Sequence, residues 1–224
     1  MEITKVTHTF SIFGNFMMLS GSEDLLKKTF NSFECKIDEE RLQPGMMSKR
    51  YVFRNKNLAI AIRAFRIDLE YAFVDKNDNQ QEFVEFVENV CVLLDGIGAT
   101  KGSRIAVSTV EFGDNTNNKL VTKCNDLFNI NNLFGKSSKE FSLRLNHITT
   151  LLNEEFNSVV LIQDGRITNN KTKEQKDVLF FNKDINSLMT NHDERFEVKN
   201  CGKYLSDLLL EVEDRNKLLT EMFN

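Results

Sequence analysis

The feature that most constrains this chain is the apolar run from Leu58 to Val74, LAIAIRAFRIDLEYAFV, which has the two-residue period of a β-strand. Before Arg63 the apolar residues occupy one phase of this period, and from Phe65 onward they occupy the opposite phase. Because one extra residue exchanges the two faces of a strand, we interpret the change of phase as a bulge or sharp bend. The run therefore predicts a single long, bent strand in the interior of an antiparallel sheet.

The segments on either side repeat one order of elements twice. Apolar periodicity predicts strands at 6–12, 49–54, 104–112, 141–151, 158–163 and 178–181, and helices at 22–33, 117–128 and 203–223. Another helix should follow the capping sequence Asp78-Asn79-Gln80-Gln81, and the polar stretch 168–176 should be a loop. We predict an α+β fold with antiparallel, strongly bent sheets flanked by helices. The order indicates an internal duplication of a β-α-β-β-(β)-α unit, within one domain (1–224) made of pseudo-repeats at about 1–98 and 102–224.

Charge and hydropathy argue against two classes of partner. The formal net charge is −4, so the chain has no basic excess to neutralise phosphates, and we expect no nucleic-acid binding. No apolar run approaches the ~20 residues of a membrane span, and the alternating N-terminus, MEITKVTHTF, does not resemble a signal peptide. These features predict a cytoplasmic protein that does not bind membranes.

The rarer residue types suggest a reducing compartment and a bacterial source. The four cysteines, Cys35, Cys91, Cys124 and Cys201, are far apart and form no C-x-x-C pair, so we expect neither a disulfide framework nor a metal site. No phosphate-binding glycine motif occurs, and we expect no cofactor. The single proline and the abundance of Asn, Phe and Lys are typical of AT-rich genomes, which fits a low-GC bacterium or one of its mobile elements.

One stretch carries a resemblance to known proteins. The sequence SRIAVSTVEFGD, at 103–114, comes after a predicted helix and before a strand pair and a closing helix. This layout resembles a sporadically distributed family of uncharacterised bacterial proteins with a duplicated β-α-β layout, and it is also similar to export-chaperone-like folds. The resemblance implies a duplicated α+β fold and brings no activity with it.

Two histidines are the best candidates for catalysis. His8 and His147 both lie in the apolar phase of predicted strands, and His147-Ile148-Thr149 matches the histidine-x-threonine pattern that two-histidine phosphoesterases carry in each of two lobes. In such an enzyme His8 and His147 would act as general base and general acid, and the Thr149 hydroxyl would hold a phosphate oxygen. His8 has no hydroxyl residue two positions later, because Phe10 stands there. The alternative is that both imidazoles are structural.

A metal-dependent nuclease is a further alternative. The chain has three E-x-K triplets, of which Glu197-Val198-Lys199 has the best context, but no acid on an adjacent predicted strand completes such a site. By elimination, the sequence favours a non-catalytic protein that binds another macromolecule, most simply another protein, in an interaction or regulatory role. Its composition suggests a mobile-element or phage-defence context. The phosphoesterase using His147, Thr149 and His8 is the alternative function.

Overall fold

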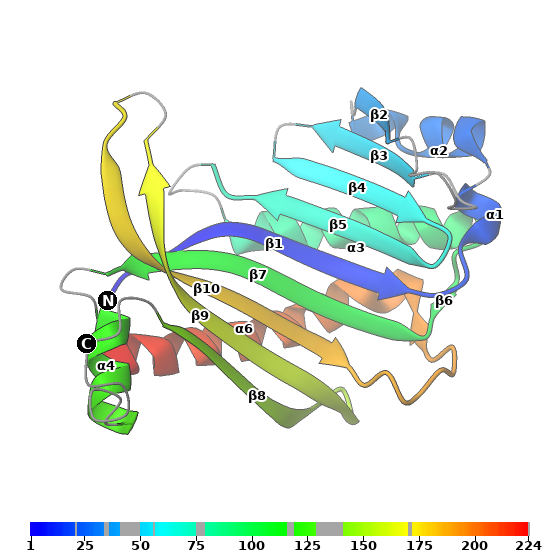
Figure 1. Cartoon of the computed structure of the whole chain (residues 1–224). Helices are drawn as coiled ribbons and strands as arrows, with labels where there is room; N and C mark the ends of the chain where they lie inside the picture. Colours follow the sequence, from blue (N-terminus) through cyan, green and yellow to red (C-terminus); the bar gives the residue numbers. More distant parts are fainter. Residues whose placement is uncertain are drawn as a thin grey trace.

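The computed structural model describes residues 1–20, 22–33, 36–40, 50–55, 57–74, 79–115, 119–128, 141–169 and 172–223. Its centre is a nine-stranded antiparallel sheet in the order β2-β3-β4-β5-β1-β7-β10-β9-β8 (Figure 1). The strands of this sheet are β1 (Ile3–Phe13), β2 (Lys36–Glu40), β3 (Arg50–Asn55), β4 (Leu58–Arg63), β5 (Arg66–Ala72), β7 (Arg104–Asp114), β8 (Ser142–Leu151), β9 (Glu154–Thr168) and β10 (Gln175–Ser187). The α+β class and the antiparallel, bent sheet flanked by helices are therefore confirmed.

The remaining elements are helices and one small two-stranded sheet. The helices are α1 (Met17–Ser20), α2 (Glu23–Thr29), α3 (Gln80–Gly96), α4 (Lys119–Phe128) and α6 (Cys201–Phe223), with 3-10 turns η1 (Asn31–Phe33) and η2 (Val198–Asn200). The small sheet pairs β6 (Lys101–Gly102) with β11 (Phe196–Glu197). Helix α3 begins where the capping sequence predicted it, and the Asn79 side chain accepts a hydrogen bond from the backbone N–H of Gln81 at its first turn. Asp78, which shares the predicted capping motif, lies outside the described residues.

The strand order is similar on the two sides of the β1–β7 pair, but one side has an extra edge strand. Outward from β1 the neighbours are β5, β4, β3 and β2, and outward from β7 they are β10, β9 and β8. On each side a central strand is followed in the chain by one or more helices, a meander and a long helix, and the meander has four strands (β2–β5) in the first half and three (β8–β10) in the second. This arrangement agrees with the order of elements read from the sequence. A common origin of the two halves by duplication stays a prediction.

The prediction of one strand from Leu58 to Val74 is wrong. The segment forms two strands, β4 and β5, which pair with each other from Leu58↔Tyr71 to Arg63↔Arg66. The change of phase at Ala64-Phe65 is thus a two-residue hairpin turn, which exchanges the faces as a bulge would. Both strands are interior, because β4 also pairs with β3 and β5 also pairs with β1. The loop predicted at 168–176 is shorter than expected, since β9 ends at Thr168 and β10 begins at Gln175.

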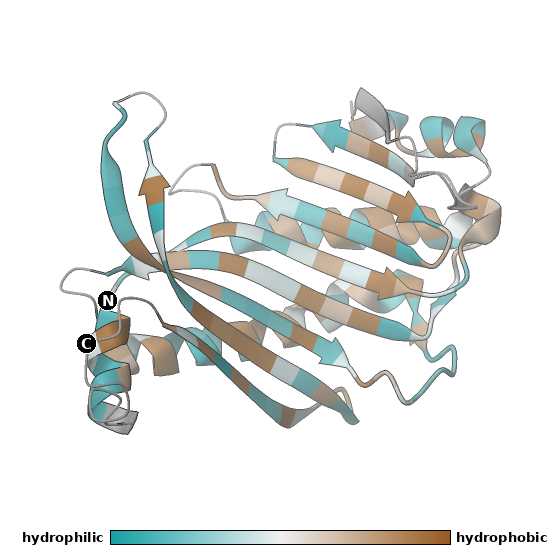
Figure 2. Cartoon of the chain, viewed as in Figure 1, coloured by the Kyte–Doolittle hydropathy of each residue, from teal (hydrophilic) through white to brown (hydrophobic). Residues whose placement is uncertain are grey.

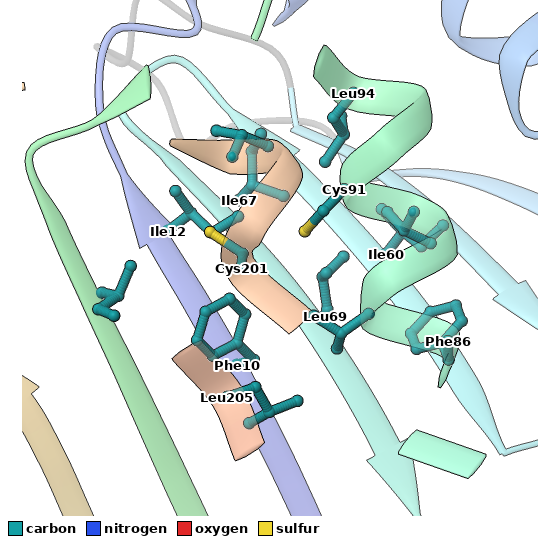
Figure 3. Close-up of a cluster of buried hydrophobic side chains, with 14 of the residues drawn as sticks. Phe10, Ile12, Ile60, Ile67, Leu69, Phe86, Cys91, Leu94, Cys201 and Leu205 are labelled. Atoms are coloured by element: carbon teal, nitrogen blue, oxygen red, sulfur yellow. The ribbon is translucent and has the colours of Figure 1, made fainter. Parts of the chain in front are cut away.

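Helices α3 and α6 cover one face of the sheet (Figure 1). Hydrophobic and hydrophilic residues alternate along many of the strands, so that each strand has an apolar face (Figure 2). The larger core joins β1 and β5 to both helices, and in Figure 3 Cys91 of α3 and Cys201 of α6 lie among Phe10, Ile12 and Leu69. A second core lies under the last turns of α6, around Val160, Ile162, Phe181, Leu219 and Phe223.

Candidate functional site

A groove lies between the edge strand β8 and the C-terminal half of α6. It has a volume of about 220 Å³ and its lining residues are Leu145, Asn146, His147, Val160, Arg215, Leu218, Leu219 and Met222. Most of these side chains are apolar. Leu145 and Leu218 are 46% and 54% exposed, so two large apolar side chains meet water at the rim of the groove.

Local sequence patterns explain how the groove is built. Alternation along β8 places Leu145 and His147 on the face that carries α6, opposite Val160 and Ser158 of β9. On α6, Leu219 points into the second core, whereas Leu218 is turned by about 100° from it and reaches the surface. No strand of the described chain lies beyond β8, so the sheet ends at this groove.

His147 contacts a pair of charged residues on α6. Its Nε2 lies against the guanidinium of Arg215 and 3.7 Å from Oε1 of Glu211, and Arg215 also forms an ion pair with Glu211 four residues earlier. A guanidinium can only donate, so this contact is a hydrogen bond only in the tautomer that leaves Nε2 of His147 unprotonated. The side chain of His147 is 39% exposed. It is therefore part of the wall of the groove and not part of the core.

His8 lies in a different environment, inside the molecule. It belongs to a polar cluster between β1, β7, β10 and α6 in which the side chains of His8, Glu111 and Lys183 are completely buried. Lys183 Nζ donates a hydrogen bond to Oε2 of Glu111, and Nδ2 of Asn216 donates to Oε1 at 3.4 Å. His8 Nε2 is 3.6 Å from the same Oε1, which is too long for a hydrogen bond, and neither ring nitrogen has a partner.

Burial and pairing act in opposite directions on the protonation of this cluster. Burial lowers the pKa of His8, and the nearby Glu111 carboxylate only partly opposes this effect. Burial alone would raise the pKa of Glu111, but His8 and Lys183 more than offset it and the pKa is lowered. Burial also lowers the pKa of Lys183 despite its contact with Glu111. We conclude that the stable form contains a neutral imidazole beside a charged glutamate–lysine pair.

The fold does not bring the two candidate imidazoles together. His8 is on β1 and His147 is on β8, and strands β7, β10 and β9 lie between them. They are thus four strand spacings apart, each about 4.8 Å. Thr149 lies on β8 two residues from His147 and therefore on the same face. General acid–base catalysis by the pair needs both groups near one substrate, and these residues do not form such an arrangement.

Sequence reasoning missed the charged partners of His8. Glu111 and Lys183 each lie in the apolar phase of their strands, next to Val107 and Thr109 in β7 and to Phe181 and Ile185 in β10. Two opposite charges at apolar positions of neighbouring strands are a signal for a buried ion pair. The signal could be used only once β7 and β10 were known to be adjacent.

Of the three E-x-K triplets, the one with the best sequence context, Glu197-Val198-Lys199, lies at the surface, and its two charged side chains contact each other. Glu197 ends β11, Val198 is buried, and Lys199 lies 3.5 Å from the Glu197 carboxylate on the surface. Within the described residues, no group of three or more His, Cys, Asp or Glu side chains could hold a metal ion. Cys91, Cys124 and Cys201 are buried free thiols, while Cys35 lies outside the described residues.

Comparisons with known proteins add no family to this description. No protein-family model matches the chain, and no curated protein matches its sequence. Of the helices that the structure describes, none combines the length and the apolar character needed to cross a membrane.

Proposed function

We propose that this chain is a non-catalytic protein that binds another protein, and that the groove between β8 and α6 is the binding site. The observation that carries the proposal is the exposure of large apolar side chains around this groove. Leu145 and Leu218 form its rim and are 46% and 54% exposed. Exposed apolar side chains grouped in this way are typical of interaction sites.

The chemistry of the groove supports binding more than catalysis. Its one imidazole contacts Arg215 and Glu211, and the other candidate, His8, is sealed in the interior. The volume of about 220 Å³ is below the ~300–1,000 Å³ of typical small-molecule sites. A space of this size suits one or two side chains of a partner protein. An interaction or regulatory role follows from this proposal, and the genes beside its own would test the mobile-element or phage-defence context.

Reconstitution with a purified partner tests the proposal. The partner would be co-purified from the native host, identified, produced separately and titrated against the wild-type chain and two variants. Leu218→Asp places a charge on the rim of the groove, and Leu210→Asp places the same charge on an exposed part of α6 outside it. Loss of one buried leucine, at ~1.5–3 kcal/mol, predicts that Leu218→Asp weakens affinity by about tenfold or more.

The Leu210→Asp variant is the matched control, because Leu210 is 65% exposed on the same helix. It should bind the partner as the wild type does. Equal affinity of wild type and Leu218→Asp for every purified partner would contradict the proposal. Circular dichroism and a thermal melt of both variants would show that the loss of binding does not come from unfolding.

A further inference from the structure

We propose that the partner binds as an extended segment that adds a tenth strand to the sheet at β8, with one large apolar side chain in the groove and a carboxylate facing Arg144. This inference rests on the proposed protein-binding function and specifies the form of the partner. It requires that the backbone of β8 can pair, that the groove lies within reach of an added strand, and that the charges agree.

The outer edge of β8 is suited to pairing. The strand is ten residues long and pairs with β9 without a register shift from Ser142↔Gln163 to Leu151↔Glu154. Edge strands are usually protected by proline, bulges, short length or several charges. The sequence SLRLNHITTL contains no proline and only one formally charged side chain, Arg144. In the described chain no other strand covers this edge.

The groove lies where a side chain of an added strand would point. Leu145 and His147 face α6 from β8, and they form one wall of the groove while Leu218 and Met222 form the other. A strand added beside β8 continues the same alternation, so every second side chain would face α6. A large apolar residue at such a position would cover Leu145 and Leu218, and the small volume of the groove fits a single anchor of this kind.

The charge on β8 favours an acidic partner over a second copy of this chain. Arg144 is exposed on the face opposite the groove, and β8 contains no aspartate or glutamate. Residues opposite each other on neighbouring strands attract when their charges differ. A second copy that paired through its own β8 could offer only another positive charge. A segment with a glutamate or aspartate beside its apolar anchor would complement this edge.

Backbone methylation of peptide ligands tests strand addition directly. The probe is a pool of fluorescent ten-residue peptides that fix a central leucine and a neighbouring glutamate and vary threonine, valine, serine and lysine elsewhere. The tightest binder would be made in two further forms, N-methylated at even or at odd positions except the leucine. Alternate N–H groups of a strand point to opposite edges, so only one of these forms should lose its hydrogen bonds to β8.

We expect one methylated form to bind about tenfold or more weakly and the other to bind within about threefold of the parent, because each lost backbone hydrogen bond contributes on the order of 1 kcal/mol. Leu218→Asp should weaken the parent peptide similarly, and Leu210→Asp should not. Equal responses to both methylation patterns would overturn strand addition. If equal responses were accompanied by a loss of binding in Leu218→Asp, the groove would still be the protein-binding site and only strand addition would be wrong.

Two other outcomes separate the inference from the function on which it rests. If no peptide of the pool binds but a purified natural partner is lost with Leu218→Asp, the extended segment is wrong and the groove is right. If neither peptide binding nor binding of the natural partner depends on Leu218, both proposals fail. A mass of two chains in light scattering that falls to one chain in Leu145→Asp would identify a second copy as the occupant and overturn the inference.

Discussion

The interior cluster at His8 and the groove at His147 contain the same kinds of side chain in opposite surroundings. Each has a histidine from a strand, a glutamate and a cation, and each lies against α6. In the interior, His8, Glu111 and Lys183 have no exposed side-chain area. Asn216 of α6 closes this cluster between the larger core, which ends near Val212, and the second core at Leu219.

In the groove, the corresponding histidine, glutamate and cation are partly exposed to solvent. The side chains of His147, Glu211 and Arg215 are 39%, 12% and 24% exposed, and apolar residues surround them. Water screens these charges and lets them change partners at little cost, whereas the buried charges depend on each other. Residue types alone therefore do not distinguish a structural site from a binding site, whereas the burial of the side chains does.

Removal of the buried cation should have the largest effect. Lys183→Met leaves the Glu111 carboxylate without its charged partner in the interior, which should reduce the free energy of unfolding by about 3–5 kcal/mol. The measurement is urea denaturation followed by circular dichroism. The double variant Lys183→Met/Glu111→Leu, which removes both charges, should recover most of the loss. A single variant within about 1 kcal/mol of wild type would contradict the role of this pair.

The next effect is a pH dependence that His8 causes. Its pKa is lowered by burial, so between that pKa and the ~6.5 of an unfolded-chain histidine the folded protein binds fewer protons at this site. The stability that depends on neutral His8 is complete above about pH 6.5 and is lost as the pH falls below it. We expect His8→Leu to flatten the pH dependence of the unfolding free energy as the pH falls below ~6.5, by up to about 1.4 kcal/mol per pH unit.

This window can be assigned to His8 because its buried partner titrates elsewhere. The pKa of Glu111 is lowered from the model-compound value of 4.5, so its own contribution falls away only at lower pH. Urea titrations at several pH values would give the slopes for wild type and variant. Identical slopes in both proteins would show that His8 does not remain neutral in the folded state.

The smallest effects on stability should come from the groove. His147→Gln and Glu211→Gln remove parts of a partly exposed set, and such pairs contribute about 0–1 kcal/mol. Each variant should therefore unfold within about 1 kcal/mol of wild type in urea. A loss of 3 kcal/mol or more from either change would place these residues in the structural core and remove the distinction from the His8 cluster.

Two hairpin turns illustrate what the sequence could and could not predict. The turn at Ala64-Phe65 has no residue with positive φ, so it needs neither glycine nor asparagine and left no turn signal. The phase change was visible, and a bulge and a tight turn explain it equally well. Between β8 and β9, Leu152 and Asn153 both have positive φ, at 54° and 60°. A leucine in this conformation is uncommon, and the start of β9 at Glu154 was not predicted.

Local patterns predicted more of the fold than of the candidate site. Alternation and helical periodicity identified β1, β7, β8, α3 and α6, because these patterns are set by residues close in sequence. The groove combines β8 with residues of α6 some seventy positions later, such as Arg215 and Leu218. Only the strand order, which places β8 at the edge beside α6, determines that these residues meet. His147 was found by its residue type, and its neighbours were not.

The decisive measurement is the affinity of the Leu218→Asp variant for a ligand peptide, made together with its unfolding free energy. We expect binding to fall by about tenfold or more while stability stays within about 1 kcal/mol of wild type, because Leu218 is 54% exposed and lies at the rim of the groove. Leu210→Asp should leave both quantities unchanged. Unaltered peptide affinity in Leu218→Asp, or a collapse of its stability, would contradict the assignment of this surface as the binding site.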